Sequence, residues 1–269
     1  MSGVHARLLK AVERTGRATV SGVAEIGYGA FLFGESLFWL AIGKRRRQPI
    51  RLRAVMAEAM EFGVRAIPIV AVLSATVGAM LAIQGIHTLR TFGAESRVTF
   101  GVALSVVREF APLITGIVVA GRSGSALAAR LGTMRINQEI DALHVMGIDP
   151  VRFLVAPALF AMLAMLPLLT LLADFVALTG AGLYIGLELG MDLPAYWDRV
   201  IEALSTDDLG HGLGKSAIFA VLITLVGVVN GSLVEGGAEG VGKATTRSVV
   251  HAISAIVVTD MLFALILTR

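Results

Sequence analysis

Four charged residues stand inside stretches of sequence that are otherwise apolar, and they offer the most chemistry in the chain. They are Arg108, Glu109, Asp174 and Asp260. A charge near the middle of a bilayer costs about 3 kcal/mol or more, so such groups normally face a bundle interior or a water-filled cavity, with a partner. Two interpretations follow. The charges either form ion pairs that only hold helices together, or they mark a polar spot inside a transport pathway.

Two glycine-rich motifs suggest other chemistry, but their surroundings argue against it. Residues 237–244 (GAEGVGKA) have the spacing of a phosphate-binding loop, yet Ala244 stands where Ser or Thr would hold magnesium, and no strand precedes them. We expect a flexible inner loop there. Residues 121–124 (GRSG) have the GxSG form of intramembrane serine proteases, with His251 the one candidate base at similar depth. Arg122 places this motif at the membrane edge, so a protease is a remote alternative.

Metal, disulfide and nucleic-acid chemistry have little support. The chain has no cysteine, and its five histidines are far apart in the sequence, so we expect no metal site and no disulfide framework. The net charge is +3, but the basic residues flank apolar runs and do not alternate with aromatic residues. That pattern favours lipid headgroups over nucleic acid. We expect no catalytic residue in this chain.

The elements that must position these charges are transmembrane helices. The 269 residues are 56% hydrophobic and 16% charged, whereas a soluble domain carries about 25% charged residues. A bilayer-spanning helix needs about 20 apolar residues, and the chain has five such runs: 66–89, 98–121, 153–187, 216–234 and 248–268. We interpret the overlong third run as one helix kinked at Pro167, because two spans would leave no room for a turn.

The N-terminal segment and the basic residues set the orientation. Residues 23–43 are apolar and aromatic but contain Glu25 and Glu35 and lie between basic residues, which favours a helix in the membrane interface over a span. With the N-terminus inside, the inner segments hold 17 Lys and Arg and the outer segments hold 4. The positive-inside rule therefore predicts an N-in, C-out topology.

A cytoplasmic helix is predicted between the second and third spans. From Ser125 to Met146 apolar residues recur at helical spacing, and Gly147 and Pro150 form a stop. Such a helix of about five turns could dock a partner protein or rest on the membrane surface. Small residues at 182, 186 and 190, and at 227 and 231, have the GxxxG spacing that lets helices pack closely.

Three blocks of sequence resemble the MlaE/YrbE permease family, the membrane subunits of ABC transporters that move lipids across the Gram-negative envelope. The blocks are REFAPL (108–113) through AGRSGSA (120–126), then LGTM (131–134), EIDAL (139–143) and MGIDP (146–150), and KATTRSVV (243–250) followed by Asp260. Two positions depart from the usual pattern: Arg130 stands where many members have Glu, and Ala158 stands where many have Arg. These departures affect the details of ATPase docking more than the resemblance itself.

The resemblance implies an all-α integral membrane protein with an N-terminal interfacial elbow helix within residues 1–60. Residues 61–269 would form a five-helix permease domain, with a coupling helix at about 125–146. Its implied function is to move phospholipids between the inner and outer membranes, which maintains outer-membrane lipid asymmetry. The chain would be a homodimer in the bacterial inner membrane. It would bind a cytoplasmic ABC ATPase that holds ATP and Mg, a periplasmic MCE-domain lipid-binding protein and, in some systems, a STAS-domain protein.

The resemblance also assigns residues to two sites. Those expected at the lipid cavity are Arg108, Glu109, Leu81, Val77, Arg247 and Asp260. Those expected to couple to the ATPase are Leu131, Met134, Glu139, Asp141 and Leu143. The alternative from another class is a stand-alone secondary transporter or channel, which would be expected to have an internal repeat. We find no such repeat.

Overall fold

A computed structural model describes residues 2–43 and 48–267, and within these residues it contains only helices and their connections. The helices are α1 (Ser2–Ile42), α2 (Leu52–Phe62), α3 (Ile67–Arg90), α4 (Val98–Ser105), α5 (Ala111–Val119), α6 (Ser125–Ile136), α7 (Glu139–Val145), α8 (Ala156–Leu189), α9 (Leu193–Ala203), α10 (Thr206–Ser232) and α11 (Gly237–Leu267). Short 3-10 turns η1 (Val64–Ala66) and η2 (Glu95–Arg97), and π-helical turns η3 (Val106–Phe110), η4 (Ala120–Gly124) and η5 (Val151–Val155), join several of them.

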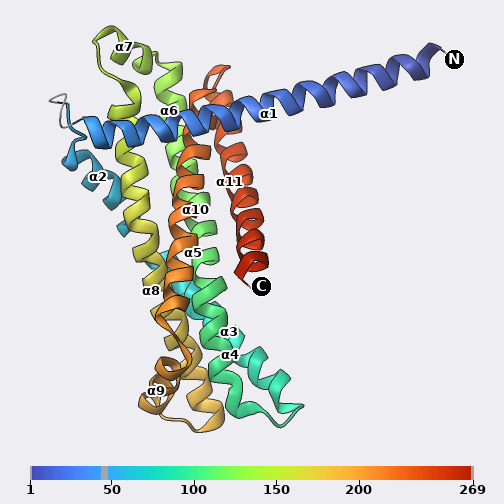
Figure 1. Cartoon of the computed structure of the whole chain (residues 1–269), viewed down its shortest axis with the longest axis vertical. Helices are drawn as coiled ribbons and strands as arrows, with labels where there is room; N and C mark the ends of the chain where they lie inside the picture. Colours follow the sequence, from blue (N-terminus) through green and yellow to red (C-terminus); the bar gives the residue numbers. More distant parts are fainter. Residues whose placement is uncertain (1, 44–47, 268–269) are drawn as a thin grey trace.

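Five helical stretches are long and apolar enough to cross a bilayer, which confirms the predicted number of spans. They are Leu52–Arg90, Glu95–Ile136, Val151–Leu189, Thr206–Ser232 and Gly237–Ile266. Helix α1 is not among them and runs across one end of the bundle, roughly at right angles to the spans (Figure 1). This end also carries α7, whereas α9 lies at the opposite end (Figure 1). We refer to them as the α7 end and the α9 end.

Helix α8 is the central element of the bundle and contacts α2, α3, α5 and α10. It is a single helix of 34 residues that includes Pro167, as the sequence predicted, and it reaches about 51 Å at 1.5 Å per residue. Its crossing with α3 is very close. A Cβ added to Gly78 would lie 1.9 Å from the carbonyl oxygen of Ala177, so only glycine allows this approach.

The predicted GxxxG glycines pack helices within this one chain. Gly182 lies against the ring of Tyr196 on α9, which would be 2.5 Å from an added Cβ. Gly231 on α10 faces the carbonyl oxygen of Ala128 on α6. Gly190 ends α8 with φ +67°, a left-handed conformation that suits glycine. Each of these glycines therefore has an intramolecular role.

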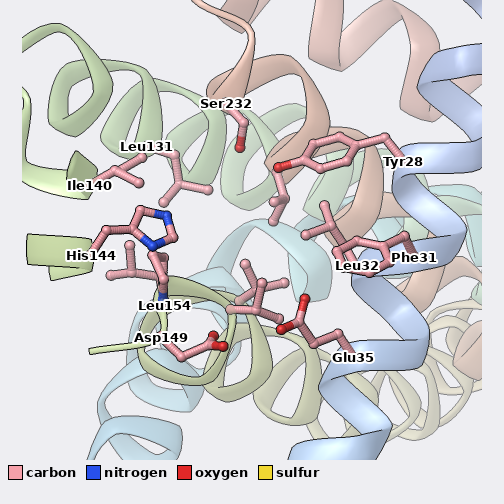
Figure 2. Close-up of a pocket in the computed structure, with 14 residues that line it drawn as sticks. Tyr28, Phe31, Leu32, Glu35, Leu131, Ile140, His144, Asp149, Leu154 and Ser232 are labelled. Carbon is pink, nitrogen blue, oxygen red and sulfur yellow. The ribbon is translucent and has the colours of Figure 1, made fainter. Parts of the chain in front are cut away.

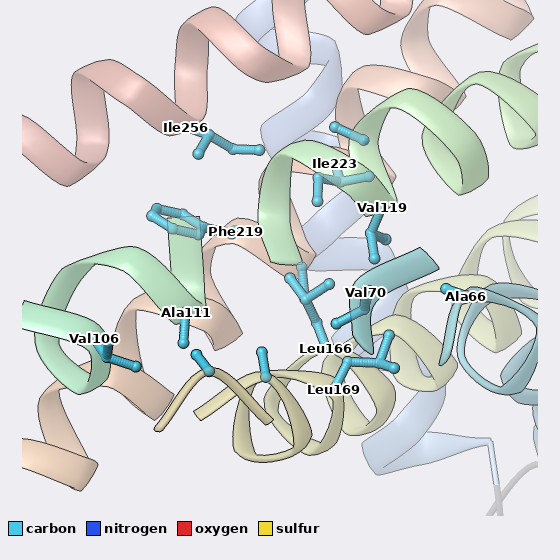
Figure 3. Packing of buried hydrophobic residues seen from close by; sticks show 14 of the residues in the cluster. Ala66, Val70, Val106, Ala111, Val119, Leu166, Leu169, Phe219, Ile223 and Ile256 are labelled. Atoms are coloured by element: carbon cyan, nitrogen blue, oxygen red, sulfur yellow. The ribbon is translucent and has the colours of Figure 1, made fainter. Parts of the chain in front are cut away.

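The hydrophobic core follows the line where the spans meet. Figure 3 shows Val70 on α3 and Leu166 and Leu169 on α8, and Val119, Phe219, Ile223 and Ile256 from the second, fourth and fifth spans. These side chains are almost fully buried. The outward faces of α3 and α11 remain apolar and exposed, as expected for helices that contact lipid.

The predicted coupling helix at 125–146 is two helices. Helix α6 continues the second span without a break as far as Ile136, and α7 begins at Glu139. Between them Gln138 has φ 58°, a left-handed conformation that interrupts the helix. Helical spacing alone could not reveal this break, because the apolar pattern continues on both sides of it. The predicted stop is present, with Gly147 at φ 72°.

Candidate functional site

A buried lysine joins three spans inside the apolar part of the bundle. Lys215 on α10 has a side chain that is 1% exposed. Its Nζ lies 2.5 Å from Oε2 of Glu109 and 3.1 Å from Oδ1 of Asp260 on α11. One cation therefore stands between two carboxylates, the arrangement that makes buried charges tolerable in a membrane.

A second ion pair adjoins the first. Arg108 donates from Nε to Oδ1 of Asp208 at 2.5 Å. Asp208 is buried near the start of α10, where its carboxylate also accepts from the backbone N–H and the hydroxyl of Ser205 in a capping box. We call Arg108, Glu109, Asp208, Lys215 and Asp260 the charged cluster.

The turn that carries Arg108 and Glu109 is a π-helix, and the sequence explains why. Pro112 has no N–H to donate to the carbonyl of Arg108 four residues earlier, so a regular α-helical bond is missing there. The N–H of Ala111 bonds instead to Val106, five residues back. This wider turn lets the adjacent side chains of Arg108 and Glu109 reach different partners on α10.

The structure brings together only some of the residues predicted for the lipid cavity. Arg108, Glu109 and Asp260 belong to the charged cluster. Val77 and Leu81 lie half-buried on α3. Asp174, singled out with the other buried charges, is buried in α8 and has no ion-pair partner among the residues described.

Arg247 is separate from the charged cluster. It lies 13 residues before Asp260 on α11, about 20 Å along the helix axis. Its Nη2 is 2.5 Å from Oε1 of Glu25 on α1. The predicted set of six residues is therefore not one contiguous site, and Arg247 instead connects the last span to the helix that crosses the α7 end.

Sequence reasoning missed Lys215 and Asp208. The fourth apolar run was taken to begin at Ser216, one residue after Lys215, and Asp208 was counted with the acidic outer segment. A signal did exist. Glu109 and Asp260 are two acids inside predicted spans that need a cation, and Lys215 borders one of the two predicted spans without an internal charge.

The residues predicted to couple to the ATPase divide by exposure. Leu131 on α6 and Leu143 on α7 are buried within this chain, and Met134 is half-buried. Glu139 and Asp141 are exposed on α7, where Asp141 accepts from Arg135 at 2.8 Å. The surface available to a partner at this point thus carries two carboxylates, one of them paired with Arg135, and the leucines pack behind it.

A cavity of about 320 Å³ separates α1 from the segment after α7. In Figure 2 Glu35 on α1 and Asp149 face each other across it, with His144 beside them. Burial raises the pKa of Glu35, and the charge of Asp149 and a hydrogen bond to it raise the pKa further. The two carboxyl groups thus form a proton-sensitive contact between α1 and the α7 end.

Neither glycine-rich motif has the geometry of its catalytic counterpart. Residues 237–243 form the first turns of α11, so the expected flexible loop is wrong and no phosphate loop is present. Ser123 is buried in η4 and donates to the carbonyl of Phe62 at 3.3 Å, which gives the hydroxyl a structural partner. Among the described residues no group of three His, Cys, Asp or Glu could hold a metal ion.

Comparison with known proteins gives a consistent answer. Residues 55–266 match the model of the family described as Permease MlaE. A probable ABC transporter permease protein of Rickettsia typhi is 32% identical, over 95% of this chain and 99% of the relative. The intermembrane phospholipid transport system permease protein MlaE of Haemophilus influenzae is 30% identical, over 95% and 97%. The chloroplastic protein TRIGALACTOSYLDIACYLGLYCEROL 1 of Arabidopsis thaliana is 32% identical, over 80% and 61%.

Proposed function

The chain belongs to the MlaE family of ABC transporter permeases, and from this premise we propose that it moves phospholipids between the inner and outer membranes of a Gram-negative envelope, maintaining outer-membrane lipid asymmetry. It is a multi-pass membrane subunit, and hydrolysis of ATP takes place in a partner ATPase. The observation that carries the proposal is the charged cluster within the spans. A phospholipid has a charged headgroup and apolar tails, so its path needs a polar spot between apolar walls.

The exposure of the side chains suggests different roles for the residues of the charged cluster. The side chain of Arg108 is 54% exposed and that of Glu109 is 39% exposed, while Lys215 is almost fully enclosed. In this proposal Arg108 meets the lipid phosphate, because its planar guanidinium can donate two parallel hydrogen bonds. Lys215 holds Glu109 and Asp260 in position. Val77 and Leu81 contact the acyl chains.

The α7 end is the proposed docking surface for the ABC ATPase, in which ATP and Mg would be bound. The inner segments carry 17 Lys and Arg against 4 outside, which supports a cytoplasmic α7 end. Glu139 and Asp141 would make the contact, with Leu131, Met134 and Leu143 packed behind them. Because α6 continues the second span directly, a shift at α7 reaches the helix that carries Arg108 and Glu109.

The other partners of the proposal follow the same orientation. A second copy of the chain would complete the lipid cavity as a homodimer. A periplasmic MCE-domain protein would receive or deliver lipid at the α9 end, and a STAS-domain protein would act on the cytoplasmic side. The membrane in this proposal is the bacterial inner membrane.

The test is transport by the chain and its ATPase, reconstituted in phosphatidylcholine vesicles that contain a fluorescent phospholipid. We expect ATP-dependent movement of the labelled lipid. The variant Glu139→Lys/Asp141→Lys should co-purify with less ATPase and lose transport, because it reverses the charge of the docking surface, while membrane insertion stays normal. Asp198→Lys, an exposed charge reversal on α9, is the matched control for ATPase binding. Ion-gradient-driven transport without the ATPase would instead support the secondary transporter.

A further inference from the structure

Three arginines from three elements surround one cavity at the α7 end. Arg51 stands at the start of α2, Arg130 lies on α6 and Arg152 lies on η5. They line a cavity of about 280 Å³ together with Glu58, and its remaining wall is largely apolar. We call these four residues the arginine pocket.

All three guanidinium groups lie over aromatic rings, with the Cζ of Arg130 6.0 Å from the ring centre of Phe62. The Cζ of Arg51 lies 5.0 Å from the ring centre of Phe153, and the Cζ of Arg152 lies 5.3 Å from that of Trp39. A guanidinium over a ring face is attracted by the ring and keeps N–H groups able to donate to a ligand. Neither Arg51 nor Arg152 forms an ion pair with any carboxylate in the described part of the chain.

Glu58 supplies the only carboxylate of the pocket, and only one of its two oxygens is paired. Its Oε1 pairs with Arg130 at 2.8 Å. Its Oε2 is buried and has no hydrogen-bond donor among the described residues. Three cations and one anion leave the pocket with a formal charge of +2, beside an acceptor that lacks a donor. A buried oxygen without a donor suggests that a hydrogen-bond donor from another molecule belongs in the pocket.

The position of the pocket indicates a membrane ligand. Helix α2 and the η5–α8 helix both begin here, so their N-terminal N–H groups add positive potential. The long apolar segment of the first span begins at Ile67, just beyond α2. Trp39, the stacking partner of Arg152, belongs to α1, which crosses this end of the bundle (Figure 1). An aromatic residue beside basic residues at a span end is typical of headgroup depth.

We propose that the arginine pocket binds the headgroup of a membrane glycerophospholipid, with its phosphate on Arg51 and Arg152 and a headgroup hydrogen-bond donor on the carboxylate of Glu58, whose side chain is 15% exposed. The ammonium of ethanolamine and the hydroxyl groups of glycerol can supply that donor. Choline cannot, because its nitrogen carries no hydrogen. The site therefore favours phosphatidylethanolamine and phosphatidylglycerol over phosphatidylcholine. This site is distinct from the charged cluster and goes beyond the proposed function, since it requires a bilayer at the α7 end but no transport.

The test is native mass spectrometry of the full chain with its ATPase, incubated with equal amounts of the three lipids after delipidation. We expect retention of ethanolamine and glycerol lipids over choline lipid by about tenfold, equivalent to about 1.4 kcal/mol. Arg51→Gln/Arg152→Gln should lose the retained lipid. Glu58→Gln should keep lipid bound but reduce the preference against choline. Arg53→Gln, an exposed arginine on the same helix that does not line the pocket, should behave as wild type.

Three results would overturn the proposal. One is equal lipid retention by wild type and Arg51→Gln/Arg152→Gln. Another is full displacement of the lipid by inorganic phosphate, which would make the pocket a site for a free anion. The third is loss of ATPase co-purification with unchanged lipid, which would assign the arginines to the protein partner. Arg51→Lys/Arg152→Lys keeps the charge and removes the planar fork, so it tests the same point if the glutamine variant unfolds; we expect weakened but measurable retention.

Discussion

The charged cluster and the arginine pocket differ in how completely their charges are paired within the chain. In the cluster, each of the five charges has an ion-pair partner, and two cations face three carboxylates. In the pocket, three guanidinium groups share one carboxylate, and each of the three lies over an aromatic ring. Depth explains the difference. A charge without a partner is costly among the spans, whereas at the membrane surface water or a lipid headgroup can bond to an unpaired arginine.

This comparison separates charges that all have an ion-pair partner within the chain from charges that lack one. Where pairing is complete, removal of one partner should damage the fold. Where it is incomplete, removal of a charge should affect binding and leave the fold intact. Each prediction below tests one side of that distinction.

The largest effect is expected for Lys215→Met. The variant leaves Asp260 and the half-buried Glu109 without their cation inside the bundle, which should destabilise the chain by about 3–5 kcal/mol. The measurement is thermal unfolding in lipid nanodiscs. Lys243→Met is the matched control, because its side chain is 75% exposed and pairs only with Glu239 one turn away, and it should change the melting temperature little.

A triple variant that removes the charges of Lys215 and both its partners tests the same role of Lys215. In Glu109→Gln/Lys215→Met/Asp260→Asn no uncompensated charge remains, so much of the lost stability should return while transport stays impaired. If Lys215→Met alone melts like wild type, Lys215 does not stabilise the spans in the way described here.

Asp208→Asn should have a smaller effect on the same region. Asparagine keeps an oxygen that can accept from Ser205 but loses the charge that pairs with Arg108, so we expect a loss of about 1–3 kcal/mol in the same unfolding assay. Asp207→Asn changes an exposed neighbour by the same chemistry and should be neutral. Equal effects of the two variants would argue against a buried ion pair at Asp208.

The five spans could be predicted from the sequence because hydropathy acts over twenty residues at a time. The single helix α8 could also be predicted, because two spans within the third apolar run would leave no room for a turn. The two-helix form of the segment at 125–146 could not be predicted, because one left-handed residue, Gln138, breaks a pattern that continues on both sides. The π-turn at Val106–Phe110 could not be predicted from the sequence either, although Pro112 causes it.

The candidate site was predictable only where a charge interrupts an apolar run. Arg108, Glu109 and Asp260 meet that condition and lie in the charged cluster. Lys215 and Asp208 lie near the ends of runs, where a charge is ordinary, and only the packing of α10 against the second and fifth spans shows that they are buried. The family resemblance grouped Arg247 with the residues of the charged cluster. In the structure Arg247 and Asp260 lie far apart along α11.

The smallest effect is expected at the α7 end, where Glu35 on α1 faces Asp149 (Figure 2). The pKa of Glu35 is raised above its ordinary 4.5 in the folded chain. The stabilisation from this contact is therefore fully present below pH 4.5 and is lost as the pH rises through the raised pKa, when Glu35 becomes charged. Because solvent reaches the cavity, the change should stay below about 1 kcal/mol.

Trp39 fluorescence reports this contact, because Trp39 lies one turn from Glu35 on α1 and the chain has only one other tryptophan, Trp197. In a Trp197→Phe background we expect the Trp39 emission to shift to longer wavelength as the pH rises, since α1 then packs less firmly. Glu35→Gln should remove this shift, and Glu13→Gln, at an exposed position on the same helix, should keep it. His144 lines the same cavity, so His144→Asn is a further control that removes its imidazole. An unchanged profile in Glu35→Gln would mean that α1 is held independently of the carboxyl pair. That result would leave the Arg247–Glu25 ion pair as the polar contact that anchors α1 to the spans.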